Sequence, residues 1–281
     1  MKERLKVLLA KLANTRPVRS TVVHLIYPNI VRALRAECLS DVSSPSGIAE
    51  QFAWKSHAYQ VLYSELAAGV NCCPERMDST WESRERIFEV ILRRIEGVPG
   101  DILEFGVSSG QSFLWFLKRC PDRHIYGFDS FEGLPEDWWT RPKGSFKAEP
   151  PRFSEPNGTL VRGWFEDSMP RFFANYHGPA ALIHVDCDLM RPSIYSLTHA
   201  IPRCREGTII LFDEYYNYPE FAQHEWLAWR QIQATYELQA ECVAYDGRRA
   251  AFQIKQIGSS KIDGLTRGAL YKTAAGGSLQ T

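Results

Sequence analysis

The spacing of hydrophobic residues changes near position 100. Before it, apolar side chains recur at helical intervals, and no run is typical of a strand. The glycine pair Gly97 and Gly100, with Pro99 between the two, ends this region. We therefore expect residues 1–97 to form an N-terminal helical extension. Its predicted helices are 3–13, 28–38, 50–68 and 79–96.

After residue 100, short β-rich runs alternate with helical runs, a pattern that predicts right-handed βαβ units and a parallel sheet. The last two β-rich runs meet at a hairpin-type turn from Tyr245 to Arg248, so the last strand should be antiparallel. We expect an α/β Rossmann-like domain over 98–257, followed by a tail at 258–281. The predicted strands are 101–105, 124–128, 159–162, 180–185, 208–212, 238–244 and 250–254, and the predicted helices are 110–119, 166–176, 191–203 and 219–236.

One long segment interrupts this alternation. Residues 130–158 hold five prolines and the pair Trp138 and Trp139, with no clear hydrophobic period. Loops of this length in a compact domain are usually functional or disordered. The aromatic residues argue against plain disorder. We interpret the segment as a lid.

Composition excludes several classes of partner. Lys plus Arg and Asp plus Glu balance at 33 each, so no strong field favours nucleic acid or an anionic membrane. No stretch approaches 18 apolar residues, and we expect no transmembrane segment. The seven cysteines are scattered without the spacing of a zinc site. This usage is typical of reduced thiols and predicts a cytoplasmic protein.

The first motif with chemical content is the sequence EFGVSSG, which begins at Glu104, follows a strand and opens a helix. Gly106 permits a tight turn with close backbone approach, and Gly110 permits close helix packing. The Glu104 carboxylate would repel a pyrophosphate but suits a cationic ligand such as a sulfonium or an amino group. The alternatives are a purely structural turn, or another Rossmann enzyme that binds NAD. The latter would need glycines where Val107 and Ser108 stand.

Asp129 ends the next predicted strand, 25 residues after Glu104. An acid about 20 residues beyond a glycine-rich turn commonly binds ribose hydroxyls. A strand-end aspartate is also a frequent helix cap. Together with the first motif, Asp129 favours a nucleoside-type cofactor.

Acidic pairs end two further strands, with Asp186 and Asp188 after one and Asp213 and Glu214 after the next. The carboxyl ends of parallel strands share one edge of a sheet, where ligands bind. Carboxylates at close range need a proton or a cation, and Mg²⁺ with oxygen ligands is the natural solution. The alternative is a set of caps and salt bridges to Arg191.

Taken together, these motifs resemble the macrocin O-methyltransferase family, metal-dependent sugar O-methyltransferases of the class I group that use S-adenosylmethionine. The resemblance runs from about Thr80 to Ile254. It depends on the turn at 104–110 and on the strings GFDSFEGLP from Gly127, GWFEDSMP from Gly163, HVDCDL from His184 and FDEY from Phe212.

The resemblance implies a seven-stranded sheet with a reversed last strand, a mobile lid at 130–158, and extensions that serve dimer contacts and substrate choice. It implies that Glu104 and Gly106 hold the methionine end of the cofactor, that Asp129 binds the ribose, and that Trp164, Phe165 and Glu166 line the adenine. The complete predicted cofactor set is Glu104, Phe105, Gly106, Ser109, Gly110, Ser112, Asp129, Ser130, Gly163, Trp164, Phe165, Glu166 and Asp186.

The predicted metal ligands are Asp186, Asp188, Asp213 and Glu214. The chain departs from the family in having Glu214 where a second aspartate is usual, and Cys187 and Met190 around the earlier pair. These departures lie at or beside predicted metal ligands, so they affect where the metal is expected to bind.

The predicted reaction is Mg²⁺-assisted transfer of a methyl group to a hydroxyl of a sugar or a glycosylated small molecule. Asp188 is the first candidate for the base and Asp186 the second. The acceptor could instead be a non-sugar diol or catechol, a lipid-linked sugar or a polysaccharide unit. A non-methyltransferase Rossmann protein and a non-catalytic assembly protein are the competing interpretations. We expect a homodimer or a higher homo-oligomer.

Overall fold

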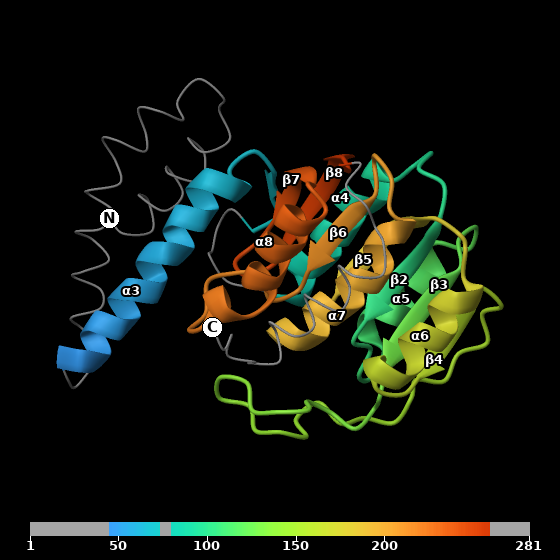
Figure 1. Cartoon of the computed structure of the whole chain (residues 1–281), viewed down its shortest axis with the longest axis horizontal. Helices are drawn as coiled ribbons and strands as arrows, with labels where there is room; N and C mark the ends of the chain where they lie inside the picture. The colour runs from blue at the N-terminus through green and yellow to red at the C-terminus, as the bar shows by residue number, and fades with distance from the viewer. Residues whose placement is uncertain (1–44, 74–79, 259–281) are drawn as a thin grey trace, which may run out of the picture. The chain divides into compact units, whose positions relative to one another are not determined.

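The computed structural model describes residues 45–73 and 80–258 of the chain (Figure 1). The helices predicted at 3–13 and 28–38, and all but the first residue of the predicted tail, lie outside the described residues. In chain order the elements are α3 (Pro45–Val61), the π-helical turn η2 (Leu62–Leu66), β1 (Val70–Asn71), α4 (Trp81–Arg94), β2 (Asp101–Phe105), α5 (Gln111–Arg119), β3 (Ile125–Asp129), β4 (Gly158–Arg162), α6 (Phe165–Asn175), β5 (Ala180–Val185), α7 (Met190–Ala200), the 3₁₀ turn η3 (Ile201–Arg203), β6 (Ile209–Phe212), the 3₁₀ turn η4 (Phe221–Gln223), α8 (Glu225–Thr235), β7 (Gln239–Tyr245) and β8 (Ala250–Gln256).

The central strands form where the sequence has short, continuous apolar runs. Every residue of β5 and of β6 is buried. Continuous apolar runs are typical of strands that helices cover on both faces of a sheet. The predicted bounds of β2 and β5 are confirmed exactly, and those of the other predicted strands agree within two residues.

The strands form one sheet in the order β1-β7-β8-β6-β5-β2-β3-β4. Strand β2 pairs in parallel with both β3 and β5, although β5 comes later in the chain. The chain therefore builds outward from β2 through β3 to β4, returns to the other side of β2, and continues to β6. Right-handed crossovers in opposite directions place α5 on one face of the sheet and α6 and α7 on the other.

The C-terminal strands agree with the predicted reversal. Strands β7 and β8 are neighbours in the sheet and are joined by the four residues 246–249, a connection that only antiparallel strands allow. Strand β8 lies between β7 and β6. We expected seven strands, none of them before residue 97, whereas the described sheet has eight because β1 joins it. The two-residue β1 pairs in parallel with β7, through Val70 with Ala244 and Asn71 with Tyr245.

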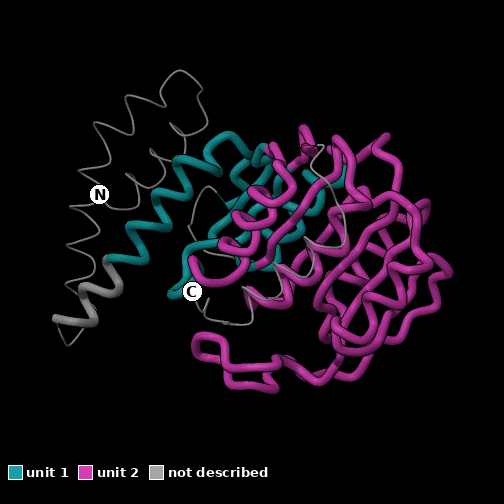
Figure 2. The backbone as a smooth tube through the Cα atoms, viewed as in Figure 1, with its two compact units in different colours: residues 1–93, 214–221, 241–252 teal, residues 94–213, 222–240, 253–281 magenta. Residues whose placement is uncertain are grey.

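The chain divides into two compact units (Figure 2). One comprises residues 1–93, 214–221 and 241–252, and the other comprises 94–213, 222–240 and 253–281. The second unit contains strands β2 to β6 and helices α5 to α8. Within it, α7 packs against α6, α8 and β5.

The predicted lid segment, 130–158, leaves β3 and returns at the start of β4, as Figure 1 shows. It folds back on itself through hydrogen bonds between Leu134 and the pair Gly144 and Ser145, and through a bridge between Trp138 and Arg141. Trp138 is buried, whereas Trp139 is 43% exposed. The segment is therefore a loop that is hydrogen-bonded to itself and exposes the aromatic side chain of Trp139.

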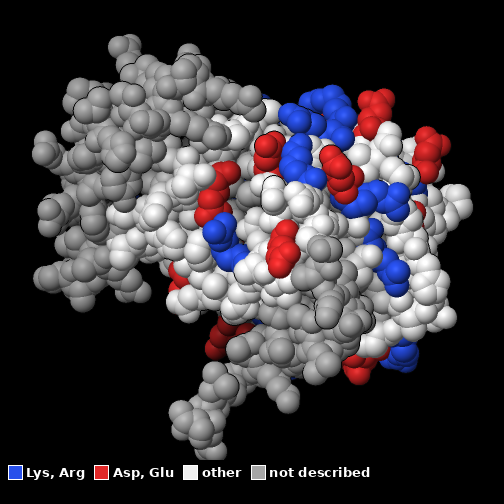
Figure 3. Space-filling view, turned by 45° about the horizontal axis from the view of Figure 1, so that its top comes forward, with Lys and Arg blue, Asp and Glu red and all other residues white. Residues whose placement is uncertain are grey.

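Charged side chains of both signs are interspersed on the face drawn in Figure 3, which agrees with the balanced composition. Within residues 45–73 and 80–258, no helix is long and apolar enough to cross a membrane.

In the first unit, a buried aspartate connects the β7–β8 turn to α4. The Asp246 carboxylate accepts hydrogen bonds from the hydroxyl of Ser83 (2.7 Å), from Nη1 of Arg249 (2.8 Å), and from the backbone N–H groups of Arg248 and Arg249. Asp246 is 1% exposed and Arg249 is 8% exposed. Removing the carboxylate would leave several donors without this acceptor.

We expect Asp246→Ala to lower the free energy of unfolding by about 3–5 kcal/mol, the usual cost of breaking a buried ion pair. Urea unfolding followed by circular dichroism measures it. Glu82→Ala is the matched control, because it removes an exposed i, i+4 pair with Arg86 whose loss should cost less than about 0.5 kcal/mol. Equal losses in the two variants would contradict the role of Asp246.

Candidate functional site

The candidate site lies where the carboxyl ends of β2 and β5 meet. This is the point of the sheet at which the strand order reverses, and ligands of open α/β sheets bind at such points. Phe105 pairs with Val185, and the backbone N–H of Asp186 donates to the carbonyl of Phe105 at 2.8 Å. Gly106 has φ +93°, and a Cβ there would stand 1.7 Å from the carbonyl oxygen of Asp186. Glycine is therefore required at 106 because the turn lies directly against the backbone of Asp186, while its role toward a cofactor stays a prediction.

The turn after Gly106 is held by Asp129. Its Oδ2 accepts hydrogen bonds from the backbone N–H groups of Val107 and Ser108, both at 2.7 Å, and its Oδ1 accepts one from Phe131. A carboxylate oxygen can accept more than one hydrogen bond. Binding of a ribose by Asp129 thus stays a prediction, beside a structural role that the sequence did not indicate.

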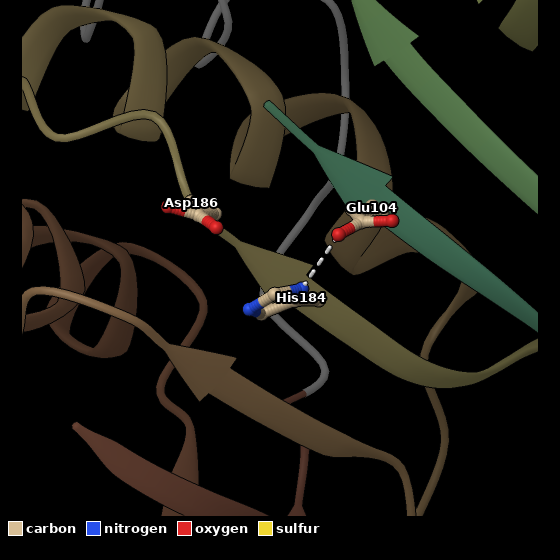
Figure 4. A group of neighbouring side chains, drawn as sticks. All are labelled: Glu104, His184 and Asp186. Atoms are coloured by element: carbon tan, nitrogen blue, oxygen red, sulfur yellow. Dashed lines mark hydrogen bonds and ion pairs between the residues drawn. The ribbon is translucent and has the colours of Figure 1, made fainter. Parts of the chain in front are cut away.

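Glu104 is fully buried at the end of β2. Its Oε1 accepts hydrogen bonds from the hydroxyl of Ser112 and from Nδ1 of His184, the latter at 3.1 Å. Among the described atoms, Oε2 of Glu104 has no hydrogen-bond partner. Figure 4 shows the interaction with His184 and the second oxygen pointing away from it. A buried carboxylate with one oxygen left over suits a cationic ligand.

His184 lies on β5 directly opposite Glu104 in the strand register. Its Nε2 is 3.9 Å from Oδ1 of Asp213. Burial by itself would lower the pKa of His184. The carboxylates of Asp213, Glu104 and Asp186 outweigh burial and raise the pKa to about 9. The imidazole is therefore protonated near neutral pH and links two buried acids.

His184 is not among the site residues predicted from the sequence, and its burial beside Glu104 was missed. Alternation along a strand places His184 and Asp186 on one face. Which residue of β2 lies opposite them depends on the register, which the sequence did not reveal.

The predicted metal ligands occupy different surroundings. Asp188 and Asp213 are buried and Asp186 is half-buried. Glu214 forms an ion pair with Arg248 at 3.2 Å. Among the described residues, the group whose possible ligand atoms all lie within 4.8 Å of one another is Glu104, His184 and Asp186, and the set of Asp186, Asp188 and Asp213 is not such a group.

Glu225, the first residue of α8, was not predicted as a site residue. It is fully buried, and its Oε1 accepts the backbone N–H of Asp188 at 3.2 Å. Asp188 has φ +62°, a left-handed conformation that is uncommon for residues other than glycine. Glu225 therefore helps to hold Asp188 in this conformation. In sequence, Glu225 stood inside a helix predicted to begin at 219, which hid its position at a helix N-terminus.

The predicted adenine side lies at the ends of β3 and β4. The backbone N–H of Gly163 donates to the carbonyl of Asp129 at 2.9 Å, which brings the two strand ends together. The rings of Phe165 and Phe105 are 6.0 Å apart, and Trp164 is 39% exposed. The remaining predicted cofactor residues differ in their exposure and partners. Ser109 is exposed, Ser130 is half-buried, Gly110 caps α5 against Pro151, and Glu166 forms an ion pair with Arg191 at 3.8 Å.

Residues 103–215 match the model of a family described as a methyltransferase domain. The chain is 28% identical over 148 residues to 8-demethyl-8-(2,3-dimethoxy-alpha-L-rhamnosyl)-tetracenomycin-C 4'-O-methyltransferase of Streptomyces olivaceus, covering 43% of this chain and 54% of the relative. It is 29% identical over 149 residues to mycinamicin III 3''-O-methyltransferase of Micromonospora griseorubida, covering 43% and 57%. The chain thus spans about half the length of the curated relatives it matches.

Solved structures show the same fold. A calicheamicin methyltransferase matches with a TM-score of 0.50 and 21% identity, covering 75% of this chain and 94% of the other. The O-methyltransferase NovP matches with a TM-score of 0.51 and 20% identity, covering 63% and 82%. The chain therefore has the α/β fold of class I methyltransferases, as the sequence predicted.

We expect Gly106→Ala to unfold the chain or to abolish ligand binding at this edge, because its Cβ would overlap the carbonyl of Asp186 and its φ is unfavourable for alanine. Thermal unfolding measures the effect. Gly144→Ala is the matched control, since it also has a positive φ but no atom within 4 Å of its Cβ. Similar melting temperatures for the two variants would contradict the close contact.

Raised protonation of His184 predicts a pH dependence of stability. The pKa of His184 in the folded protein, about 9, exceeds the ordinary value of 6.5. Protonated His184 therefore contributes fully to the free energy of unfolding below about pH 6.5, and this contribution is lost as pH rises through 9. Between these values the metal-free protein should lose up to about 1.4 kcal/mol per pH unit more than His184→Asn does. Urea unfolding at several pH values in EDTA measures this. Parallel profiles would contradict the prediction.

Proposed function

We propose that the chain is an O-methyltransferase that uses S-adenosylmethionine. The observation that carries the proposal is the buried Glu104 carboxylate, whose Oε2 has no partner among the described atoms, beside the glycine turn at the reversal of the strand order. This site lies within the residues that match the methyltransferase domain. A pyrophosphate would be repelled by Glu104, which disfavours a dinucleotide.

The residues present suit this cofactor. Glu104 is placed to accept the cationic amino end, and Gly106 lets the turn beside it lie against the end of β5. We assign the ribose to Asp129 and the adenine to the aromatic residues Trp164 and Phe165, at the joined ends of β3 and β4. When bound, the cofactor supplies an electrophilic methyl group on a sulfonium. The protein holds the reactants in line, which lowers the barrier by about 7–11 kcal/mol in well-oriented systems.

For the metal we propose Mg²⁺ with ligands among Asp186, Asp188 and Asp213. Their ligand atoms do not all lie within 4.8 Å of one another, so one or two of these carboxylates would hold the ion and water would complete its shell. Glu214 is the least suited of the four predicted ligands, because Arg248 already neutralises it at 3.2 Å. Bound Mg²⁺ would lower the pKa of an acceptor hydroxyl.

Asp188 is our first candidate for the group that takes the hydroxyl proton, with Asp186 second. Its backbone is anchored by Glu225 and its side chain is 8% exposed, so a proton received there is shielded from bulk water.

We propose a hydroxyl of a sugar or glycosylated small molecule as the acceptor, because one relative is named for O-methylation of a rhamnosyl tetracenomycin and the other for O-methylation of mycinamicin III. The lid is attached to the cofactor turn, since the hydroxyl of Ser108 donates to the carbonyl of Phe146 at 3.1 Å. We propose that 130–158 closes over the acceptor and excludes water. A diol or catechol acceptor would be identified by the same turnover assay.

We expect the protein to bind S-adenosylhomocysteine in calorimetry and to methylate a glycosylated substrate only with a divalent cation. EDTA should reduce turnover at least about a hundredfold while changing the affinity for S-adenosylhomocysteine less than about threefold, and Asp213→Ala should reduce turnover as strongly. Glu82→Ala, on an exposed helix face, is the control and should keep full turnover. Full activity in EDTA would contradict the metal, and absence of S-adenosylhomocysteine binding would contradict the methyltransferase.

A further inference from the structure

The two oxygens of the Glu104 carboxylate have different surroundings. Oε1 accepts two hydrogen bonds, from the hydroxyl of Ser112 and from Nδ1 of His184 at 3.1 Å. Oε2 is buried and accepts none from the described atoms. Because a carboxylate only accepts hydrogen bonds, Nδ1 of His184 must carry the proton that it shares with Oε1.

This asymmetry has a structural origin. Glu104 and His184 are directly paired between β2 and β5, and both are fully buried, so neither side chain can turn into solvent. Ser112, 3% exposed in the first turn of α5, approaches Oε1 from the helix that follows the glycine turn. Donors from two separate elements, β5 and α5, thus converge on one oxygen atom of a residue on β2.

We propose that His184 and Ser112 are positioning residues that hold Oε1 of Glu104 and thereby direct Oε2 toward the ammonium group of the cofactor. This inference rests on the proposed function, since it assumes that Glu104 receives that group. Neither residue touches the reacting atoms in this scheme. Ser112, predicted from sequence to bind the cofactor, acts through Glu104 instead.

The physical need for such a clamp follows from the carboxylate itself. The terminal torsion of a glutamate is broad, so an unrestrained carboxylate would rotate and spread its charge over several orientations. A buried carboxylate also needs donors to offset the loss of water. Two donors on Oε1 meet both requirements and leave Oε2 preorganised for a cation before any ligand arrives.

Two substitutions of similar size separate the contacts of His184. In His184→Asn, the amide nitrogen occupies the place of Nδ1 and can still donate to Glu104. In His184→Gln, the amide extends toward the place of Nε2, beside Asp213, and the contact with Glu104 is lost. We expect His184→Gln to weaken binding of S-adenosylhomocysteine at least about tenfold, and His184→Asn to keep it within about threefold.

A second ligand distinguishes positioning from general damage to the site. 5'-Methylthioadenosine shares the adenosine part of the cofactor but lacks its ammonium group, so His184→Gln should leave its affinity unchanged. Ser112→Ala should show the same selective loss for S-adenosylhomocysteine. Calorimetry with both ligands on the full chain, with melting temperatures recorded for every variant, is the experiment.

Two results would overturn the positioning role. One is an equal loss of affinity for both ligands in His184→Gln. The other is an equal affinity for S-adenosylhomocysteine in the Asn and Gln variants. If both His184 variants fail to fold, Ser112→Ala decides, and unchanged binding of S-adenosylhomocysteine in it overturns the clamp. If the unmodified chain binds neither ligand, the proposed function itself has failed and the clamp fails with it.

Discussion

The structure depends on the contact between two backbones at the reversal of the strand order. The turn that leaves β2 touches the end of β5 at Gly106 and Asp186, with no space for a side chain between the two. This contact joins the part of the chain that builds outward through β3 and β4 to the part that returns through β5 and β6. It also sets how far the groups carried by the two strands stand from each other.

That constraint explains why charged groups are buried so close to the centre of the sheet. With the strands in this register, Glu104 lies opposite His184, and Asp213 lies beyond His184 at 3.9 Å. An isolated carboxylate in such a place would be costly. A protonated imidazole between two carboxylates offsets the cost, and the hydroxyl of Ser112 adds a further donor.

Residues with different structural roles lie at this same edge of the sheet. Asp129 holds the glycine turn, Glu225 holds Asp188 in its left-handed conformation, and Ser108 joins the turn to the segment 130–158. In this arrangement several acidic residues act on the backbone or on other side chains, which leaves few carboxylate oxygens for a ligand. Polar groups that the protein itself holds in this way have fixed orientations.

The sequence by itself determined the order of the strands β2 to β8 along the chain and their bounds within two residues, the hairpin at the C-terminal end, and the positions of the glycine turn and of the long segment 130–158. These follow from local properties, namely apolar periodicity, continuous buried runs and turn residues, which need no knowledge of distant contacts. Only the tertiary structure decided the strand β1, the partnership of Glu104 with His184, the use of Asp129 on the turn, the pairing of Glu214 with Arg248 and the burial of Glu225. Each of these joins residues 21 or more positions apart, and register and helix packing, rather than the pattern of any single segment, bring them together.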